Sequence, residues 1–354
     1  MFEDVLQAWD GDEAVVRFDA ASGTWMIVAV HDTTLGPGMG GTRMKTYAAP
    51  HDALADALRL AGAMTLKHAA ADLPYGGGKA VLAVPEVPPP GSEHRLAILG
   101  RYGRMVEALG GTYVTAADMN TGQADMDVVG ERTTHVLGRS PEHGGSGDPG
   151  SGTAQGVFHG IVATVRRAFG DPSLAGRSVL VQGVGSVGSR LVELLHEAAA
   201  TLMVADIDPA RAGEVATRLG AQTIDADAVV GTECDVYAPC ATGGVLSAAT
   251  IPRLRCRVVA GAANNQLAEP HDAELLAEAG ILYAPDYVIN AGGVLHLAGY
   301  ETLGWTPEQM AARLEGIGDT LDEVFTTSER EAITTDAAAA HLARARIDAA
   351  RAAG

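Results

Sequence analysis

The sequence predicts an α/β protein of two domains, and three observations support this fold class. The chain has 354 residues, which corresponds to about two domains at roughly 100–200 residues each. Strand and helix patterns alternate up to about residue 135. A stretch with five glycines, residues 143–152, then precedes a second alternating region. We expect one domain over 1–142, a hinge, and a second domain over 143–330, with the C-terminal helix, about 331–354, packing back on the first.

The first region begins with a predicted hairpin and continues as alternating helices and strands. β-rich residues flank a turn of Asp19 to Gly23. Alanine, leucine and methionine then recur at helical spacing, and Ser92 is a typical N-cap for the next helix. The expected strands are 14–18, 25–30, 80–84 and 111–115, and the expected helices are 52–69 and 92–109. Residues 87–91 are expected to form a loop.

The second region contains a helix, a strand, a helix and a strand in close succession. We expect a helix over 153–168, a strand over 178–182, a helix over 189–198 and a strand over 202–205. Helical periodicity returns over about 306–353, with a break and a new N-cap at Ile333 to Asp336. No internal repeat interrupts this order.

Composition and charge exclude several classes of protein. Hydrophobic residues make up 47% of the chain and charged residues 19%, as in globular proteins. Acidic residues outnumber basic ones by 44 to 25, which gives a formal charge of −19, the wrong sign for a surface that attracts nucleic acid or anionic lipid. The apolar stretches are too short for a membrane span, and the N-terminus does not have the pattern of a signal peptide. We expect a cytoplasmic protein without nucleic-acid or membrane partners.

The three cysteines, Cys234, Cys240 and Cys256, are an odd number without a Cys-x-x-Cys pair. This pattern predicts neither a disulfide framework nor a zinc site. We expect no metal, and we interpret the cysteines as small apolar side chains.

A dinucleotide-binding pattern begins at residue 178. Gly183, Gly185 and Gly188 form G-x-G-x-x-G directly after a predicted strand and before a predicted helix. Gly183 allows a tight turn, Gly185 lets the backbone approach a pyrophosphate, and Gly188 lets the helix pack on the strand. The next strand ends at Asp206, 23 residues after Gly183. This combination predicts a Rossmann domain.

Asp206 selects the cofactor. Its carboxylate can accept hydrogen bonds from ribose hydroxyls and would repel a 2′-phosphate, so we expect NAD rather than NADP. Arg211 lies nearby and could soften that repulsion, although we interpret it as a solvated helix residue.

Only three lysines occur among the 25 basic residues, and two of them, Lys67 and Lys79, lie twelve residues apart around a glycine cluster. Burial and neighbouring charge can make a lysine neutral and reactive, which arginine does not allow. We expect the two lysines to lower one another's proton affinity in a glycine-lined cleft. This makes both of them candidates for chemistry.

Three segments expected at loop edges carry the remaining polar and glycine-rich motifs: Gly36 to Arg43, Leu73 to Lys79, and Ala116 to Thr121. Together with Gly261 to Leu267 and Tyr283 to Gly293, they resemble the glutamate/leucine/phenylalanine/valine dehydrogenases. The resemblance extends over nearly the whole chain. It implies a substrate-binding and catalytic α/β domain followed by a Rossmann domain across a cleft, a homo-oligomer, and NAD-dependent oxidative deamination of an L-amino acid to a 2-oxo acid and ammonia.

The resemblance also implies roles for individual residues. Lys67 would bind the substrate carboxylate, Lys79 would polarise the α-carbon centre and activate water, and Asp118 would exchange a proton with the amino group. Gly40, Gly41 and Asn264 would contact the substrate. The expected cofactor contacts are Gly183, Gly185, Ser186, Val187, Gly188, Asp206, Cys240 and Ala241, with Thr153, Asn264 and Asn290 at the nicotinamide end.

The expected side-chain pocket consists of Met39, Ala116, Val294 and Leu297. Glutamate enzymes of the family have a lysine at the position of Met39, so a charged substrate tail would have no partner here. Ala116 and Val294 resemble the leucine and valine enzymes, which favours a branched aliphatic substrate. Asp118 to Thr121, His296 with Leu297, and segment 299–305 resemble phenylalanine enzymes, so phenylalanine is the alternative.

Other interpretations are a hydroxy-acid dehydrogenase and a non-catalytic NAD-binding sensor. The first needs a histidine–acid pair and an arginine for the carboxylate, and no histidine here has that context. The second conflicts with the complete set of lysines, aspartate and asparagine. His68 and His296 are expected either to pack or to support the site residues, and Tyr75 either joins the site or lines it.

Overall fold

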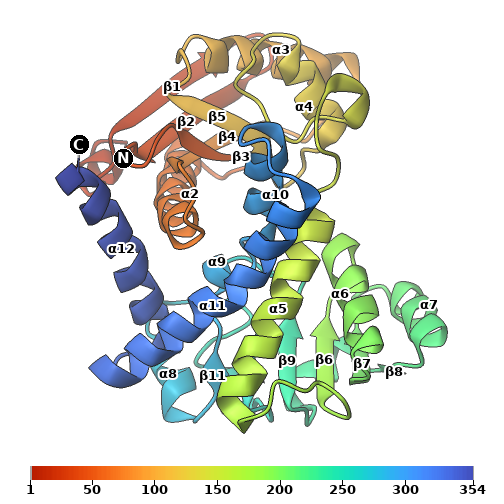
Figure 1. Ribbon diagram of the computed structural model, residues 1–354. Coiled ribbons are helices and arrows are strands. Elements are labelled where there is room, and N and C mark those ends of the chain that lie inside the picture. The colour runs from red at the N-terminus through yellow and green to blue at the C-terminus, as the bar shows by residue number, and fades with distance from the viewer. Residues whose placement is uncertain (1, 354) are drawn as a thin grey trace. The chain divides into compact units, whose positions relative to one another are not determined.

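The computed structural model describes residues 2–353, and these fall into two compact units (Figure 1). The first unit contains the chain up to Asp148, then Leu297–Gly304 and the residues from Ala343 onward. The second contains Pro149–His296 and Trp305–Leu342. The first boundary lies six residues beyond the expected one, and the last helix contributes to both units.

The first unit contains a five-stranded sheet in the order β1-β2-β4-β3-β5. β1 pairs antiparallel with β2, and β2 with β4, whereas β3 runs parallel to β4 and β5. Its elements are α1 (Phe2–Gln7), β1 (Glu13–Asp19), β2 (Thr24–Asp32), β3 (Gly38–Lys45), α2 (Pro50–Ala70), β4 (Gly76–Ala83), α3 (Glu93–Glu107), β5 (Tyr113–Ala117), α4 (Gln123–Gly130) and a 3-10 turn at Pro141–His143.

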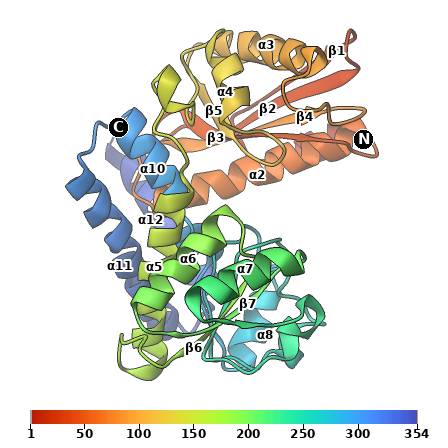
Figure 2. The same ribbon diagram turned by 90° about the vertical axis from the view of Figure 1, so that its right-hand side faces the viewer.

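Both faces of this sheet are covered, because side chains alternate along each strand. Ile27, Ala29 and Val81 pack with alanines and leucines of α2 on one face. Met26, Val28 and Leu82 pack with α3 and α4 on the other. Figure 2 shows α2 along one face of the strands and α3 on the opposite face. The odd-numbered positions of β2 and β4 therefore point toward α2.

The predicted hairpin, helices and strands of this region are confirmed within a few residues, but the glycine clusters are not loop edges. Gly38–Lys45 forms the strand β3, and β4 begins at Gly76 and is buried along its whole length. A Cβ on Gly77 would lie 2.0 Å from the Thr65 hydroxyl of α2. The glycines are thus strand residues that let a helix approach the sheet closely.

The second unit contains a parallel sheet in the order β11-β10-β9-β6-β7-β8. This is the strand order of a dinucleotide-binding fold, in which the order of successive strands along the sheet reverses between β6 and β9. Its elements are α5 (Gly150–Phe169), β6 (Ser178–Gln182), α6 (Ser186–Glu197), β7 (Thr201–Ala205), α7 (Pro209–Leu219), β8 (Gln222–Thr223), β9 (Val236–Pro239), β10 (Val258–Val259), α8 (Asp272–Glu278), β11 (Leu282–Tyr283), α9 (Asp286–Ile289), α11 (Pro307–Glu331) and 3-10 turns at Ala226–Gly231 and Ile251–Arg253.

Two helices have residues in both units. They are α10 (Gly292–Glu301) and α12 (Thr335–Ala353). The break expected at Ile333 to Asp336 is confirmed, since α11 ends at Glu331 and α12 begins at Thr335. Over residues 2–353, no helix combines the length and hydropathy that a bilayer crossing requires.

Candidate active site and dinucleotide pocket

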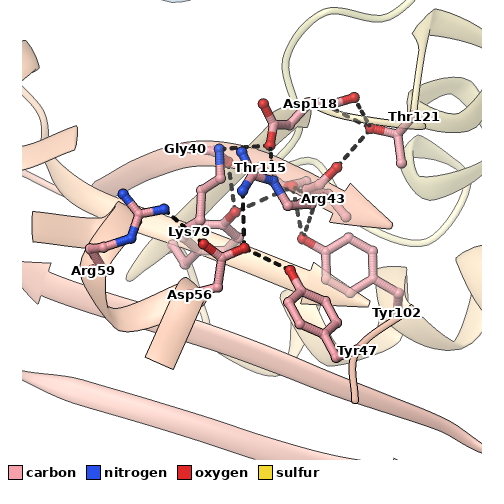
Figure 3. Close-up of polar contacts among 12 residues, drawn as sticks. Gly40, Arg43, Tyr47, Asp56, Arg59, Lys79, Tyr102, Thr115, Asp118 and Thr121 are labelled. Atoms are coloured by element: carbon pink, nitrogen blue, oxygen red, sulfur yellow. Dashed lines mark hydrogen bonds and ion pairs between the residues drawn. The ribbon is translucent and has the colours of Figure 1, made fainter. Parts of the chain in front are cut away.

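Lys79 is a buried side chain on β4, only 5% exposed. It occupies an odd position of the strand, as Val81 does, and so lies on the face that α2 covers. Its Nζ is 3.0 Å from Oδ2 of Asp118, which follows directly after β5 (Figure 3). The structure therefore brings together the two residues expected to carry the chemistry, from positions 39 residues apart in sequence.

Arg43 of β3 joins the same carboxylate. Its Nε donates to Asp118 Oδ2 over 3.0 Å, and its Nη1 donates to Asp56 Oδ2 of α2 over 2.9 Å. Asp56 also accepts hydrogen bonds from the Tyr47 hydroxyl and from Arg59. Figure 3 shows this row of alternating charges, Lys79, Asp118, Arg43, Asp56 and Arg59. Each buried charge thus has an opposite neighbour, as burial of ions requires.

The surroundings shift the pKa values of both expected catalytic groups. Burial lowers the pKa of Lys79, although Asp118 raises it, and Arg43 lowers it further. Burial acts to raise the pKa of Asp118, but the charges of Lys79 and Arg43 outweigh it and lower this pKa. The cation that contributes to the lowered pKa of Lys79 is Arg43, and the expected mutual effect of Lys67 stays a prediction. The site holds an ionised carboxylate beside an amine that loses its proton unusually easily.

The loop that carries Asp118 is fixed by Thr121. The Thr121 hydroxyl accepts a hydrogen bond from the Asp118 backbone N–H over 2.9 Å and donates to the Thr42 carbonyl over 2.7 Å. The loop is thereby tied to β3, the strand that carries Arg43.

Gly40 and Gly41 lie beside this pair. β3 pairs with β4 up to Met39 and again from Thr42, so the pairing between these two strands is interrupted at the two glycines. Both glycines remain paired with β5. A Cβ on Gly41 would lie 2.8 Å from the Asp118 Cβ and 2.6 Å from the Ala117 carbonyl oxygen. Position 41 must therefore be glycine for Asp118 to occupy its place.

Lys67 lies in the last turn of α2 and is partly exposed. The next residue, His68, is fully buried, and its Nδ1 is 2.7 Å from the Gly76 carbonyl oxygen at the start of β4. Burial lowers the pKa of His68 to about 4, and the charge of Lys67 lowers it as well. His68 is therefore a neutral, buried side chain that joins the last turn of α2 to the start of β4. The Tyr75 hydroxyl donates to Thr302 over 2.7 Å.

The expected pocket residues are distributed over both units. Met39 and Ala116 are buried on the neighbouring strands β3 and β5, and Leu297 is buried on α10 within the first unit. Val294 is half-buried and belongs to the second unit. A common pocket formed by all four remains a prediction.

A cavity of about 290 Å³ lies in the second unit, at the point where the strand order reverses. Among the expected cofactor contacts it is lined by Gly183, Gly185, Asp206, Cys240 and Ala241. Gly183 has a φ of +94°, and a Cβ there would lie 2.7 Å from the Ala241 Cβ. The turn thus needs glycine both for its conformation and for its closeness to the segment after β9.

The remaining expected contacts of the motif, Ser186, Val187 and Gly188, lie at the start of helix α6. A Cβ on Gly188 would lie 1.9 Å from the Gly183 carbonyl oxygen, so helix α6 needs glycine to pack on the turn. Ser186 and Val187 form the first turn of α6, where the Ser186 hydroxyl accepts a hydrogen bond from Arg190.

Asp206 lies at the edge of this cavity with its carboxylate held by two backbone donors. Val184 N–H and Asp208 N–H each donate to it over 2.9 Å. Arg211 also lines the cavity, with its Nη1 3.6 Å from Asp206 Oδ1. Arg211 is half-exposed, as expected of a solvated helix residue, and it also lines the cavity, where its charge could soften the repulsion of a 2′-phosphate.

The residues expected near the nicotinamide lie at the start of α5 and in the loops after β10 and α9. The Thr153 hydroxyl donates to the Pro149 carbonyl over 3.1 Å. Asn290 is buried, and its Nδ2 donates to the exposed Asn264 over 2.9 Å and to the Ala262 carbonyl. The structure joins Asn264 and Asn290 to each other.

Sequence reasoning missed the role of Arg43 and Asp56, and it missed Ile207 and Thr242 in the cavity. Arg43 ends the glycine-rich segment Gly36 to Arg43, and its place in that motif was a usable signal. Asp56 had no signal, since it is one of several acids in an amphipathic helix. Ile207 follows Asp206 directly and is 93% exposed. An apolar residue directly after a predicted strand end was a usable signal for this position.

Within residues 2–353, no group of three or more side chains has the arrangement of a metal site.

Comparison with known proteins places these features in context. A family profile described as "Glu/Leu/Phe/Val dehydrogenase, dimerisation domain" matches residues 16–135, and one described as "Glutamate/Leucine/Phenylalanine/Valine dehydrogenase" matches residues 204–354. Leucine dehydrogenase of Geobacillus stearothermophilus is 44% identical over 97% of this chain and 92% of its own. Valine dehydrogenase of Streptomyces virginiae is 43% identical over 96% of this chain and 94% of its own. The crystal structure of L-tryptophan dehydrogenase from Nostoc punctiforme is 37% identical, covers 99% of both chains and has a TM-score of 0.83.

Proposed function

The chain belongs to the glutamate/leucine/phenylalanine/valine dehydrogenase family, and from that premise we propose that it catalyses the reversible NAD-dependent oxidative deamination of L-leucine or L-valine. The products would be the 2-oxo acid, ammonia and NADH. The observation that carries the proposal is the buried Lys79–Asp118 pair, 3.0 Å apart.

The two residues of this pair suit the two proton transfers that the reaction requires. After hydride leaves the α-carbon, water must attack an imine carbon, and a general base must take its proton. Lys79 is suited to this role because burial lowers its pKa. Asp118 remains ionised, and it would accept a proton from the substrate amino group and return one to the leaving ammonia. Lys67 would hold the substrate carboxylate, and the interrupted ladder at Gly40 and Gly41 would leave backbone groups for the substrate.

An apolar substrate side chain is supported by Met39. It is 2% exposed and lies beside Gly77 of β4 and Val114 of β5, with no cation at this position to balance a second carboxylate. Ala116 on the adjacent strand is apolar as well, and its side chain is small. The names of the leucine and valine dehydrogenases that this chain resembles support a branched side chain. An aromatic substrate is the second candidate, supported by the likeness to L-tryptophan dehydrogenase.

The cofactor site fits a dinucleotide. The turn at Gly183 and the opposing Ala241 form a cradle that a Cβ would fill, and Asp206 is fixed to accept hydrogen bonds from a ribose. When bound, NAD would accept the hydride from the α-carbon. Gly183, Gly185, Cys240 and Ala241 would hold its phosphates and adenosine half, and Thr153, Asn264 and Asn290 would hold its nicotinamide end. A 2′-phosphate would meet the Asp206 carboxylate, although Arg211 would offset part of that repulsion.

We also propose that the protein is a homo-oligomer that assembles through the first unit. The profile for residues 16–135 is described as a dimerisation domain. Strand β1 lies at the end of its sheet and exposes Phe18 by 54% and Val16 by 36%, and such an edge can pair with another chain. Light scattering should give a multiple of 36.3 kDa, and Val16→Lys with Phe18→Lys should lower it. A monomeric wild-type protein would refute this part.

The first test is the initial rate of NADH oxidation with ammonia and one 2-oxo acid at a time. The acids are 4-methyl-2-oxopentanoate, 3-methyl-2-oxobutanoate, phenylpyruvate, indolepyruvate and 2-oxoglutarate. We expect the first two to react fastest and 2-oxoglutarate not to react. Preference for an aromatic acid would replace the branched-chain proposal, and no ammonia-dependent rate with any acid would overturn the function. NADPH in place of NADH tests the cofactor.

A further inference from the structure

Arg43 makes two different contacts from one guanidinium, and neither is to a group at the surface. Nε donates to Asp118 and Nη1 donates to Asp56. The Arg43 side chain is 14% exposed and that of Asp56 is 15% exposed. A planar guanidinium can hold two carboxylates in fixed directions, whereas a lysine ammonium is a single point of charge. Arg43 therefore links Asp118 rigidly to helix α2.

The way in which Asp118 is held is specific. Both Lys79 and Arg43 contact the same oxygen, Oδ2, at 3.0 Å. The other oxygen, Oδ1, takes no part in this network, and the Asp118 side chain is 23% exposed. Two donors on one oxygen fix the rotation of the carboxylate, and the Thr121 hydroxyl fixes the backbone of the same residue.

We propose that Arg43 is a positioning residue, which holds Asp118 by Oδ2 so that Oδ1 faces the substrate amino group, and that Asp56 holds Arg43 in turn. This inference rests on the proposed function. Arg43 acts through Asp118, since its two hydrogen bonds are taken by carboxylates of the protein. Asp56, on α2, serves as the anchor because its Oδ2, which accepts from Arg43, also accepts a hydrogen bond from the Tyr47 hydroxyl and is thereby fixed in direction.

Arg43 has a second effect, on Lys79. The charged groups that face Lys79 are Asp118 after β5, Arg43 on β3 and Asp56 on α2. Arg43 lowers the pKa of Lys79 by its charge, and it also shares the Asp118 carboxylate that would otherwise serve Lys79 alone. Loss of Arg43 should raise the pKa of Lys79 by both routes. The acidic limb of the pH–rate profile should then move to higher pH.

Two substitutions separate position from charge. Arg43→Gln removes the charge and both hydrogen bonds, and Arg43→Lys keeps the charge but cannot reach Asp118 and Asp56 together. If Arg43 positions Asp118, we expect both variants to lose about 10- to 100-fold in kcat, with little change in KM for the 2-oxo acid. Arg43→Gln should shift the acidic limb further than Arg43→Lys, which keeps the charge. A fully active Arg43→Lys variant would show that charge alone matters and would overturn the positioning role.

Two further variants and a rescue test the same chain of contacts. Asp56→Asn should lower kcat in the same direction as Arg43→Lys but by less, because an amide oxygen can still accept a hydrogen bond. Arg59→Gln is the matched control, since the Arg59 side chain is 57% exposed and contacts only the other oxygen of Asp56 in this network; its kcat should stay within about twofold. Guanidinium ion at low concentration should partly restore Arg43→Ala. Equal effects of Arg59→Gln and Arg43→Gln would contradict the proposal.

A labelling experiment keeps this proposal separate from the proposed function. The chain has only three lysines, Lys45, Lys67 and Lys79, so amine acetylation of each can be followed by mass spectrometry as a function of pH. We expect the pH of half-maximal labelling of Lys79 to rise in Arg43→Gln and to stay unchanged in Arg59→Gln. If the wild-type protein oxidises no NADH, the proposed function fails and the positioning role with it, while this shift still decides whether Arg43 lowers the pKa of Lys79. If NADH is oxidised but the Arg43 variants keep their kcat, only the positioning role fails. An unchanged Lys79 profile in Arg43→Gln would overturn the effect of Arg43 on Lys79.

Discussion

The two candidate sites of this protein are built in opposite ways. The cavity proposed to bind the dinucleotide is formed mainly by backbone and small residues of a contiguous motif after β6, completed by the segment after β9. The ionic site of the first unit is formed by long charged side chains from β3, α2, β4 and the end of β5. The first is open and needs glycine for shape, and the second is buried and needs each charge to have a partner. Substitutions should therefore weaken the pocket gradually but disable the ionic site abruptly.

The largest effect should come from Lys79→Met. It removes the expected base and leaves the Asp118 carboxylate held by Arg43 alone. We expect kcat to fall by about 10³-fold or more, as for loss of a general base with its electrostatic partner, while NAD binding by calorimetry is unchanged. Lys45→Met is the matched control, because Lys45 is exposed and lies over the Tyr47 ring. Normal turnover in Lys79→Met would remove this residue from the mechanism.

Gly41→Ala tests whether the ionic site depends on backbone space as the pocket does. The added Cβ would meet the Ala117 carbonyl and the Asp118 Cβ, so Asp118 must move. A displacement of this size should lower kcat by about 100-fold without changing NAD affinity. Gly100→Ala on α3 has nothing within 4 Å of the new Cβ and should have full activity. Unchanged kcat in Gly41→Ala would mean that the loop after β5 adapts.

The pH dependence of the wild-type enzyme sharpens the same contrast. Burial lowers the pKa of Lys79 from its usual value of 10.5, and the neutral amine is the reactive form. The rate of oxidative deamination should therefore rise with pH and level off before pH 10.5. In contrast, NAD affinity should change little over this interval. A rate that falls as pH rises from neutral would contradict the role of Lys79 as a base.

Asp206→Ser should have a smaller effect, confined to the cofactor. Loss of the hydrogen bonds to the ribose should raise the KM for NAD by about tenfold, which corresponds to about 1.4 kcal/mol, and should relax discrimination against NADP. Asp227→Ser removes an exposed carboxylate next to Ala226, which lines the cavity, and serves as the control. Equal KM shifts in the two variants would indicate a general effect of charge.

The smallest effect on catalysis should come from Arg346→Met, in the part of α12 that belongs to the first unit. Arg346 Nη1 donates to the carbonyls of Ala69 and Ala70 at the end of α2 over 3.0 and 2.7 Å. We expect a loss of about 1–2 kcal/mol in the free energy of unfolding and a modest rise in KM for the 2-oxo acid, since Lys67 lies in the same turn. Arg344 is exposed, so Arg344→Met should change neither the free energy of unfolding, measured by urea denaturation, nor the KM for the 2-oxo acid.

Much of the fold could be predicted because local patterns are strong. The hairpin around Gly23, the helix capped by Ser92 and the break before Thr335 follow from turn residues, caps and periodicity, which act over a few residues. β3 and the start of β4 were missed because glycine is rare in strands. Only their neighbours, a helix on one side and Tyr113 on the other, explain why side chains are excluded there.

The sequence by itself determined the strand–turn–helix–strand segment that lines the cavity of the second unit, and it singled out two residues that the structure brings together in the ionic site, Lys79 and Asp118. Gly183, Gly188 and Asp206 lie in one strand–turn–helix–strand segment, so their spacing carries their geometry. Only the tertiary structure decided which charges meet Lys79. Arg43, Asp56 and Asp118 come from three elements whose register depends on the packing of the whole sheet against α2. Electrostatic interactions depend on distance through space and on burial, and neither can be read from separation along the chain.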